Sequence, residues 1–215
     1  MFDIEVKRAT QPVARLILAH GAGAGKEHDF MQQMAERLTA LQVEVVLFNF
    51  PYMQTIKQTG KRRPPDKAEK LLSHFDSVIA QTNATADDLP TFIGGKSMGG
   101  RMASMLLANQ QDGSNRVLGA IALGYPFHPP GKPEKTRTAH LVELDKPMLI
   151  IQGERDTFGT QSEVECYTLS NTIECAFLND GDHSFKPRKA SGYTLDDHIA
   201  LAAELVAAFI NRHSQ

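Results

Sequence analysis

Gly95-Lys96-Ser97-Met98-Gly99 lies between an apolar, strand-like run at 89–94 and a small-residue helical pattern at 99–109. A Gly-x-Ser-x-Gly pentapeptide between a strand and a helix holds its serine in a cramped turn, so the hydroxyl projects from the edge of the sheet. The two glycines lack a Cβ, which lets strand and helix close tightly around the turn. The alternative is a serine in an ordinary glycine-rich turn. The flanking strand and helix patterns favour a nucleophilic Ser97.

Two glycine-rich stretches bear some likeness to nucleotide-binding loops, but neither fits. A P-loop ending at Gly95-Lys96-Ser97 would need a glycine at position 90, which is Pro90. The stretch 21–26 places its third glycine one position early for a dinucleotide fingerprint, and His20 stands where a P-loop needs its first glycine. Nucleotide binding is therefore a disfavoured alternative.

Strand-like and helix-like patterns alternate along the chain. The strand patterns cover 14–19, 43–48, 91–94, 117–123, 148–152 and 172–178, and the helical patterns cover 29–41, 66–81, 100–109, 161–169 and 195–212. Near-continuous apolar runs suit strands buried on both faces of a parallel sheet, and 2–8 is a candidate antiparallel edge strand. We predict the α/β class, a doubly wound, mostly parallel sheet forming one domain over 1–215. Two long connections remain, 52–65 and 125–145.

Composition excludes several broad classes of protein. The 215 residues carry a formal net charge of −2, which argues against general attraction to nucleic acid or to membranes. The N-terminus lacks the apolar region of a signal peptide, and no apolar run is long enough to span a membrane. The cysteines, Cys166 and Cys175, have neither metal-ligand nor redox spacing. We expect a cytoplasmic protein without metal or cofactor, and the oligomeric state is left open.

Three reactive residues follow strands in the order Ser97, Asp156, His183. Because the carboxyl ends of parallel strands share one edge, these side chains can converge there. A serine hydroxyl needs a neutral imidazole to take its proton, and the imidazolium needs a carboxylate that fixes its tautomer. We assign these roles to His183 and Asp156, with Glu154 and Asp182 as weaker candidates for the carboxylate.

The chain resembles compact α/β-hydrolases of the predicted-hydrolase group related to dienelactone hydrolases, which includes hydrolase-like domains of testis-expressed and chromatin-complex proteins. The triad order also matches that of α/β-hydrolases. The matching segments are His20-Gly21-Ala22-Gly23-Ala24-Gly25, Phe48-Asn49-Phe50-Pro51-Tyr52, Gly95-Lys96-Ser97-Met98-Gly99-Gly100-Arg101, Gly124-Tyr125-Pro126-Phe127-His128-Pro129-Pro130-Gly131-Lys132, Gln152-Gly153-Glu154-Arg155-Asp156 and Gly181-Asp182-His183-Ser184-Phe185.

The resemblance implies an α/β-hydrolase fold and an oxyanion-binding loop after the first core strand. In this chain the backbone N–H groups of Ala22 or Gly23, together with that of Met98, would receive the oxyanion. The connection 125–145 is too short for a lid domain, so we expect a minimal cap or none and an open site. Candidate substrate-contacting residues are Tyr52, Arg63, Tyr125, Phe127, Phe158 and Phe185.

The loops 51–65, 125–145 and 179–192 hold ten basic and five acidic side chains, although the whole chain is slightly acidic. Either this charge attracts an anionic ester, thioester or acylated partner, or the basic side chains are simply solvated. The predicted function is hydrolysis of a small carboxylic ester or thioester through an acyl-enzyme. The alternative is a non-catalytic α/β-hydrolase fold that serves as a binding or scaffold protein.

Overall fold

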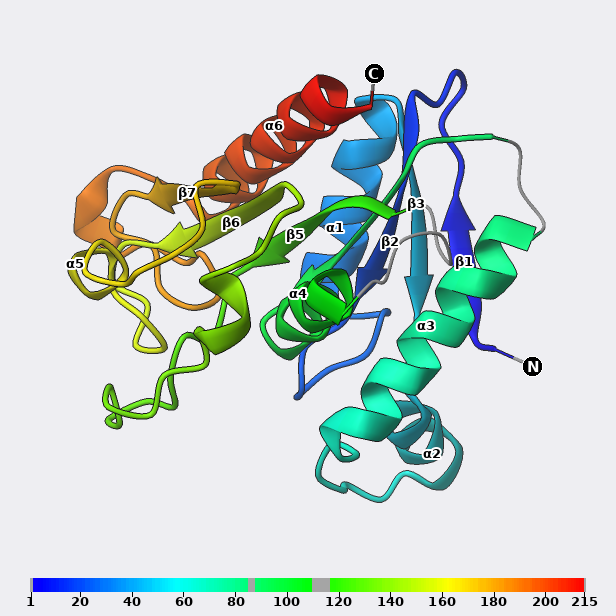
Figure 1. Ribbon diagram of the computed structural model, residues 1–215, viewed down its shortest axis with the longest axis horizontal. Coiled ribbons are helices and arrows are strands. Elements are labelled where there is room, and N and C mark those ends of the chain that lie inside the picture. The colour runs from blue at the N-terminus through cyan, green and yellow to red at the C-terminus, as the bar shows by residue number, and fades with distance from the viewer. Residues whose placement is uncertain (1, 85–87, 110–116, 215) are drawn as a thin grey trace.

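A mixed sheet with helices on both faces forms the core of the molecule (Figure 1). Over residues 2–84, 88–109 and 117–214, which the computed structural model describes, seven strands lie in the order β1-β3-β2-β4-β5-β6-β7. Their bounds are β1 Ile4–Lys7, β2 Ala14–Ala19, β3 Val43–Phe48, β4 Thr91–Lys96, β5 Val117–Leu123, β6 Met148–Gly153 and β7 Ile173–Leu178. Only β1 runs antiparallel to its neighbour within this part of the chain. The predicted doubly wound, mostly parallel sheet with an antiparallel edge strand is confirmed.

Two helical layers cover the sheet. Helices α1 (Asp29–Ala40) and α6 (Leu195–His213) pack on one face, and α3 (Ala68–Ala84) and α4 (Met98–Asn109) pack on the other. Shorter helical segments are α2 (Pro51–Thr59), α5 (Gln161–Val164), η1 (Ala139–Leu141) and η2 (Lys189–Ser191). The layers leave the carboxyl ends of the strands uncovered, and that edge is where the long connections gather (Figure 1).

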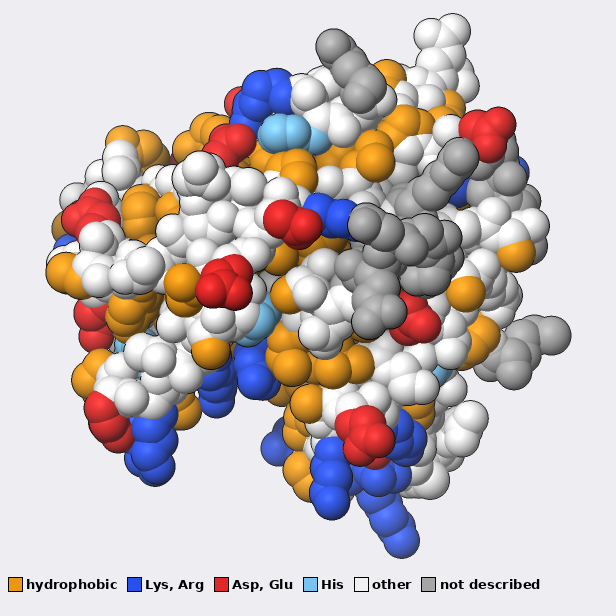
Figure 2. Space-filling model, viewed as in Figure 1, with side chains coloured by type: hydrophobic (Ala, Val, Ile, Leu, Met, Phe, Trp, Pro, Cys, Tyr) orange, Lys and Arg blue, Asp and Glu red, His pale blue; other side chains and the backbone are white. Residues whose placement is uncertain are grey.

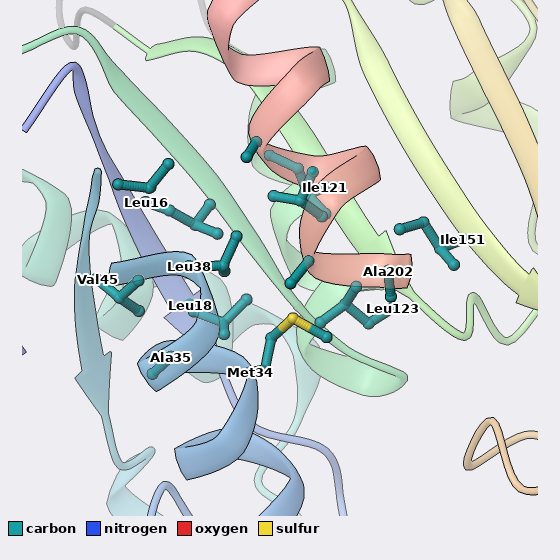
Figure 3. Close-up of a cluster of buried hydrophobic side chains, with 14 of the residues drawn as sticks. Leu16, Leu18, Met34, Ala35, Leu38, Val45, Ile121, Leu123, Ile151 and Ala202 are labelled. Carbon is teal, nitrogen blue, oxygen red and sulfur yellow. The ribbon is translucent and has the colours of Figure 1, made fainter. Parts of the chain in front are cut away.

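Alternation along the buried strands builds a separate apolar cluster on each face. In β2, Leu16 and Leu18 face α1 and α6, whereas Ile17 and Ala19 face the other layer. Figure 3 shows Leu16 and Leu18 in the first cluster together with Leu38 and Met34 of α1. All six residues of β2 are buried, as are all six of β3. Their sequences are apolar except for Arg15 and Glu44, which pair with each other at 2.6 Å.

The structure differs from the prediction mainly in which residues form helices. Residues 51–59, expected in a long connection, form α2, because Pro51 starts the helix and Gly60, with φ of 68°, ends it in the left-handed region. The pattern at 161–169 is helical only over Gln161–Val164, so Cys166 lies in an exposed turn. The helix expected at 66–81 spans Ala68–Ala84 instead.

The connection between β5 and β6 folds back onto the α4 face of the sheet. Tyr125, Phe127 and Leu141 from this connection are buried in the apolar cluster of that face. It contributes only the short η1 in place of a lid domain, so the expected minimal cap is confirmed. Among the described residues, no helix has both the length and the apolar character needed to span a bilayer.

Candidate active site

Ser97 occupies the tight turn between β4 and α4. Its φ is 51°, a left-handed conformation that is uncommon for residues other than glycine, and its N–H donates to Leu123 O at 3.0 Å. The neighbouring glycines permit this turn: an added Cβ would lie 2.7 Å from Ala19 O at Gly95 and 2.5 Å from the same oxygen at Gly99. The sequence therefore holds the serine at the carboxyl edge of the sheet.

His183 lies within hydrogen-bond distance of both other residues predicted to form the triad. His183 Nε2 is 2.8 Å from Ser97 Oγ, and His183 Nδ1 is 2.7 Å from Asp156 Oδ2. With Nδ1–H donating to the carboxylate, Nε2 accepts from the serine hydroxyl, which is the orientation a general base needs. The ring of Phe158 packs on the imidazole with centroids 4.1 Å apart.

The Asp156 carboxylate is fully buried and held from two further directions. Gln152 Nε2 donates to Oδ2 at 2.9 Å, and the Phe158 N–H donates to Oδ1 at 2.8 Å. Together with His183, these donors supply the hydrogen bonds that a buried carboxylate requires. Gln152 is itself oriented by the backbone, since its Oε1 accepts from Tyr125 N at 2.8 Å.

The two alternative carboxylates have other partners. Glu154 Oε2 accepts from Asp180 N at 2.7 Å, and Asp182 Oδ1 accepts from the N–H groups of Ser184 at 2.8 Å and Lys186 at 2.9 Å. Both therefore brace the loop that carries His183. Of these three carboxylates, Asp156 is the one that the structure brings to the imidazole.

Lys96 contacts the main chain of the same histidine. Its Nζ donates to His183 O, and it lies 5.5 Å from the ring centroid of Phe30 and 5.4 Å from that of Phe185. Burial lowers the pKa of Lys96 to about 8. The ammonium therefore joins the end of β4 to the loop of His183.

The loop after β2 is fixed from beneath by His20 and Tyr52. His20 Nε2 accepts from Phe50 N at 3.0 Å, so Nδ1–H donates to Gly21 O at 2.7 Å. Burial lowers the pKa of His20 to about 4, which keeps the ring neutral. Tyr52 OH donates to Ala22 O at 2.9 Å. These contacts turn the backbone carbonyl groups of Gly21 and Ala22 toward the core and keep the loop next to Ser97.

A cavity of about 650 Å³ opens next to Ser97 on the α1 and α6 side of the sheet. Its lining includes the loop 21–24, the start of α1, the start of α6, and the triad residues Ser97 and His183. Apolar lining side chains are Phe30, Met31, Phe158, Leu195 and Ile199. Mostly apolar walls with a few polar groups are typical of small-ligand sites.

Several residues predicted to contact substrate lie elsewhere. Tyr52, Tyr125, Phe127 and Phe185 are fully buried in the core and do not line this cavity, although Phe185 lies behind Lys96. Arg63 is exposed on the connection before α3, 3.5 Å from Asp66. Aromatic residues that follow strands can face either the core or the active-site edge, and here most complete the core. Phe158 is the predicted aromatic residue that lines the cavity.

Sequence reasoning missed the contribution of the two helices on the α1 face. Phe30 and Met31 come from α1, while Leu195 and Ile199 come from α6, far along the chain. The start of α1 could have been found, because it directly follows the loop 21–25. The start of α6 carries no such signal. Among the described residues, no group of three or more His, Cys, Asp or Glu side chains is arranged to hold a metal ion.

The sheet order, the two helical layers and the serine turn together define the α/β-hydrolase fold. The chain belongs to the alpha/beta hydrolase domain family, which it matches over residues 12–211. This agrees with the resemblance drawn from the sequence motifs.

Solved structures support the same fold. A dienelactone hydrolase from Anabaena variabilis is 16% identical with a TM-score of 0.71, covering 98% of this chain and 91% of its own. A serine hydrolase without a lid from Xanthomonas campestris is 17% identical with a TM-score of 0.69, covering 98% and 88%. Est1E from Butyrivibrio proteoclasticus, with ferulic acid bound, is 15% identical with a TM-score of 0.68, covering 99% and 95%.

Proposed function

We propose that this protein is a serine hydrolase that cleaves a small carboxylic ester or thioester through an acyl-enzyme. The observation that carries the proposal is the continuous chain of hydrogen bonds from Asp156 through His183 to Ser97. A scaffold protein has no need of this alignment, nor of a serine held at positive φ beside a cavity. The neighbour with ferulic acid, a carboxylic acid, is consistent with a carboxylic ester as substrate.

In this mechanism Ser97 Oγ attacks the acyl carbon while its proton passes to His183 Nε2. Asp156 stabilises the resulting imidazolium and holds its Nδ1–H in place. The backbone N–H groups of Ala22 or Gly23 and of Met98 donate to the developing oxyanion. Removing one such donor typically reduces turnover by about 10²–10³.

Collapse of the tetrahedral intermediate expels the alcohol or thiol, which takes the proton from the imidazolium of His183. Water, activated by the same imidazole, then attacks the acyl-enzyme, and its collapse releases the acid and restores the Ser97 hydroxyl. The apolar cavity beside Ser97 would hold the hydrocarbon part of the substrate. Phe158, packed on the imidazole, would limit the access of water to that side of the ring.

Labelling with a fluorophosphonate probe tests the nucleophile directly. Wild-type protein should be labelled, and Ser97→Ala should lose the label completely. Ser184→Ala is the matched control, because Ser184 also lines the cavity but lacks a hydrogen bond to His183 in the described part of the chain. Retained labelling in Ser97→Ala would remove Ser97 from the nucleophile's role, and no labelling of the wild type would favour a binding or scaffold protein.

A further inference from the structure

Two arginines on the α4 side of Ser97 form no ion pair with any residue that the structure describes. Arg101 lies one helical turn beyond the serine, and its N–H donates to Ser97 O at 3.1 Å. Arg137 lies in the connection between β5 and β6, where its N–H donates to Phe127 O at 2.7 Å. Within the described residues neither side chain forms an ion pair, and Arg101 Nε is buried without a hydrogen-bond partner.

A shared polar cluster holds the two arginines next to each other. Ser104 Oγ donates to Arg101 O at 2.8 Å and lies 2.8 Å from His140 Nε2. Tyr125 OH donates to Arg137 O at 2.9 Å and lies 3.5 Å from the same His140 nitrogen. One Ser-His-Tyr cluster therefore fixes the backbone at both arginines.

The two guanidinium groups also affect each other through their charges. Burial, and then the charge of Arg101, lower the pKa of Arg137. Both side chains are half-buried, so solvent screens this repulsion only in part. An anion bound between the two guanidinium groups would relieve this repulsion.

The other basic side chains near this edge are differently placed. Three of them pair with nearby carboxylates: Lys57 with Glu27, Arg63 with Asp66 and Arg188 with Asp180. Most of the rest are exposed on loops and solvated. Figure 2 shows Lys and Arg side chains on both sides of a hollow at the lower edge of the molecule, where the connections after the strands gather in Figure 1.

We propose that Arg101 and Arg137 form an anion-binding subsite beside Ser97, and that it holds a carboxylate or phosphate group carried by the substrate. The substrate class rests on the hydrolase function proposed above. A guanidinium presents a planar fork of N–H donors that matches both oxyanions, so two of them can bind one group at several points. The subsite and the apolar cavity lie on opposite sides of the nucleophile's strand. The substrate would therefore carry its charge at one end and its hydrocarbon part at the other.

Kinetics with matched esters test the subsite. We compare 4-nitrophenyl butyrate, which is neutral, with 4-nitrophenyl hemisuccinate and 4-acetoxybenzoate, which carry a carboxylate on the acyl and leaving group respectively. Arg101→Gln and Arg137→Gln should each lower kcat/KM about 10- to 100-fold for at least one anionic ester and leave butyrate within twofold. Lys135→Gln removes one exposed charge from the same connection and is the control.

Equal losses for neutral and anionic esters, or the same loss in Lys135→Gln, would overturn the proposal. Arg101→Lys keeps the charge but removes the planar fork, so it covers the case in which Arg101→Gln does not fold. In Arg101→Lys, kcat/KM for the anionic ester should still fall more than kcat/KM for butyrate.

A binding measurement separates this proposal from the hydrolase function. At constant ionic strength, succinate or inorganic phosphate should raise the melting temperature of the wild type and of Ser97→Ala. The increase should vanish in Arg101→Gln Arg137→Gln and persist in Lys135→Gln. A response to succinate alone identifies a carboxylate site, and a response to phosphate alone identifies a phosphate site. No response to either anion in the wild type would refute the subsite even if ester hydrolysis is observed.

Discussion

Replacing Asp156 by asparagine places a side-chain amide where the structure provides three hydrogen-bond donors. Phe158 N points at Oδ1, while Gln152 Nε2 and His183 Nδ1 point at Oδ2. An asparagine with its NH₂ at the Oδ2 position would donate to His183 Nδ1 and move the imidazole proton to Nε2. It would also face the Gln152 amide, donor against donor.

The opposite orientation preserves the tautomer but sets the NH₂ against the Phe158 N–H. In that orientation the buried Phe158 N–H loses its acceptor, which costs about 1–3 kcal/mol of stability. In the first orientation Gln152 Nε2 keeps two acceptors, Tyr125 O at 3.2 Å and Gly159 O at 3.0 Å. The wrong tautomer leaves no base for Ser97 and reduces kcat by about 10⁴, equivalent to about 5 kcal/mol. The backbone N–H of Phe158 is less adjustable than a glutamine side chain, so we expect the orientation with the wrong tautomer to prevail.

The assay is kcat for a 4-nitrophenyl ester, together with the free energy of unfolding from urea denaturation. Glu154→Gln is the matched control, since its amide oxygen can still accept from Asp180 N, and it should keep kcat within a few-fold of the wild type. A value of kcat within tenfold of the wild type in Asp156→Asn would refute the role of Asp156. A large loss in Glu154→Gln instead would transfer that role to Glu154.

Further predictions concern the nucleophile, the tight turn and two titrating groups. Ser97→Ala should lower kcat by about 10⁶ with an unchanged melting temperature; substantial residual turnover would contradict the mechanism. Gly99→Val should prevent folding, because even a Cβ would lie 2.5 Å from Ala19 O; soluble protein with a normal melting temperature would contradict the close approach. The pKa of His20 is about 4 when folded and 6.5 otherwise, so the unfolded chain binds the proton first and stability falls from about pH 6.5 to 4. His20→Gln should show a smaller fall in unfolding free energy between pH 7 and 4.5, and an equal fall would disprove this origin. The pKa of Lys96 is lowered from 10.5 to about 8, so as the pH rises the folded chain loses this proton before the unfolded chain does. The free energy of unfolding should therefore increase as the pH rises between these two values. Lys96→Met should lack that gain when unfolding is compared at pH 8 and pH 10, and a gain equal to that of the wild type would count against it.

The fold could be predicted from the sequence because its signals are local. Each buried parallel strand is one apolar run, and the glycines beside Ser97 report a close approach that tolerates no Cβ. Helix α2 escaped prediction although Tyr52, Met53 and Ile56 recur at helical spacing, because it spans only nine residues and so short a helix depends on contacts with other segments.

The sequence could place only those residues of the candidate site that follow directly after strands. Ser97, Asp156 and His183 each follow a strand, so their shared edge was readable from the sequence. The walls of the cavity could not be predicted from the sequence, because they come from α1 and α6, which lie near opposite ends of the chain. An aromatic residue after a strand, such as Tyr125 or Phe127, fits the core and a binding site equally well in the sequence. Only the packing of the β5–β6 connection decides between them.

Two adjacent residues hydrogen-bond to different parts of His183: the Ser97 hydroxyl to its ring, and the Lys96 ammonium to its main-chain carbonyl. Swinging the segment that follows β7 away from the sheet would have to break both attachments together. Under the proposed mechanism, the two reactive side chains are already in place before a substrate arrives, so none of its binding free energy is needed to order them.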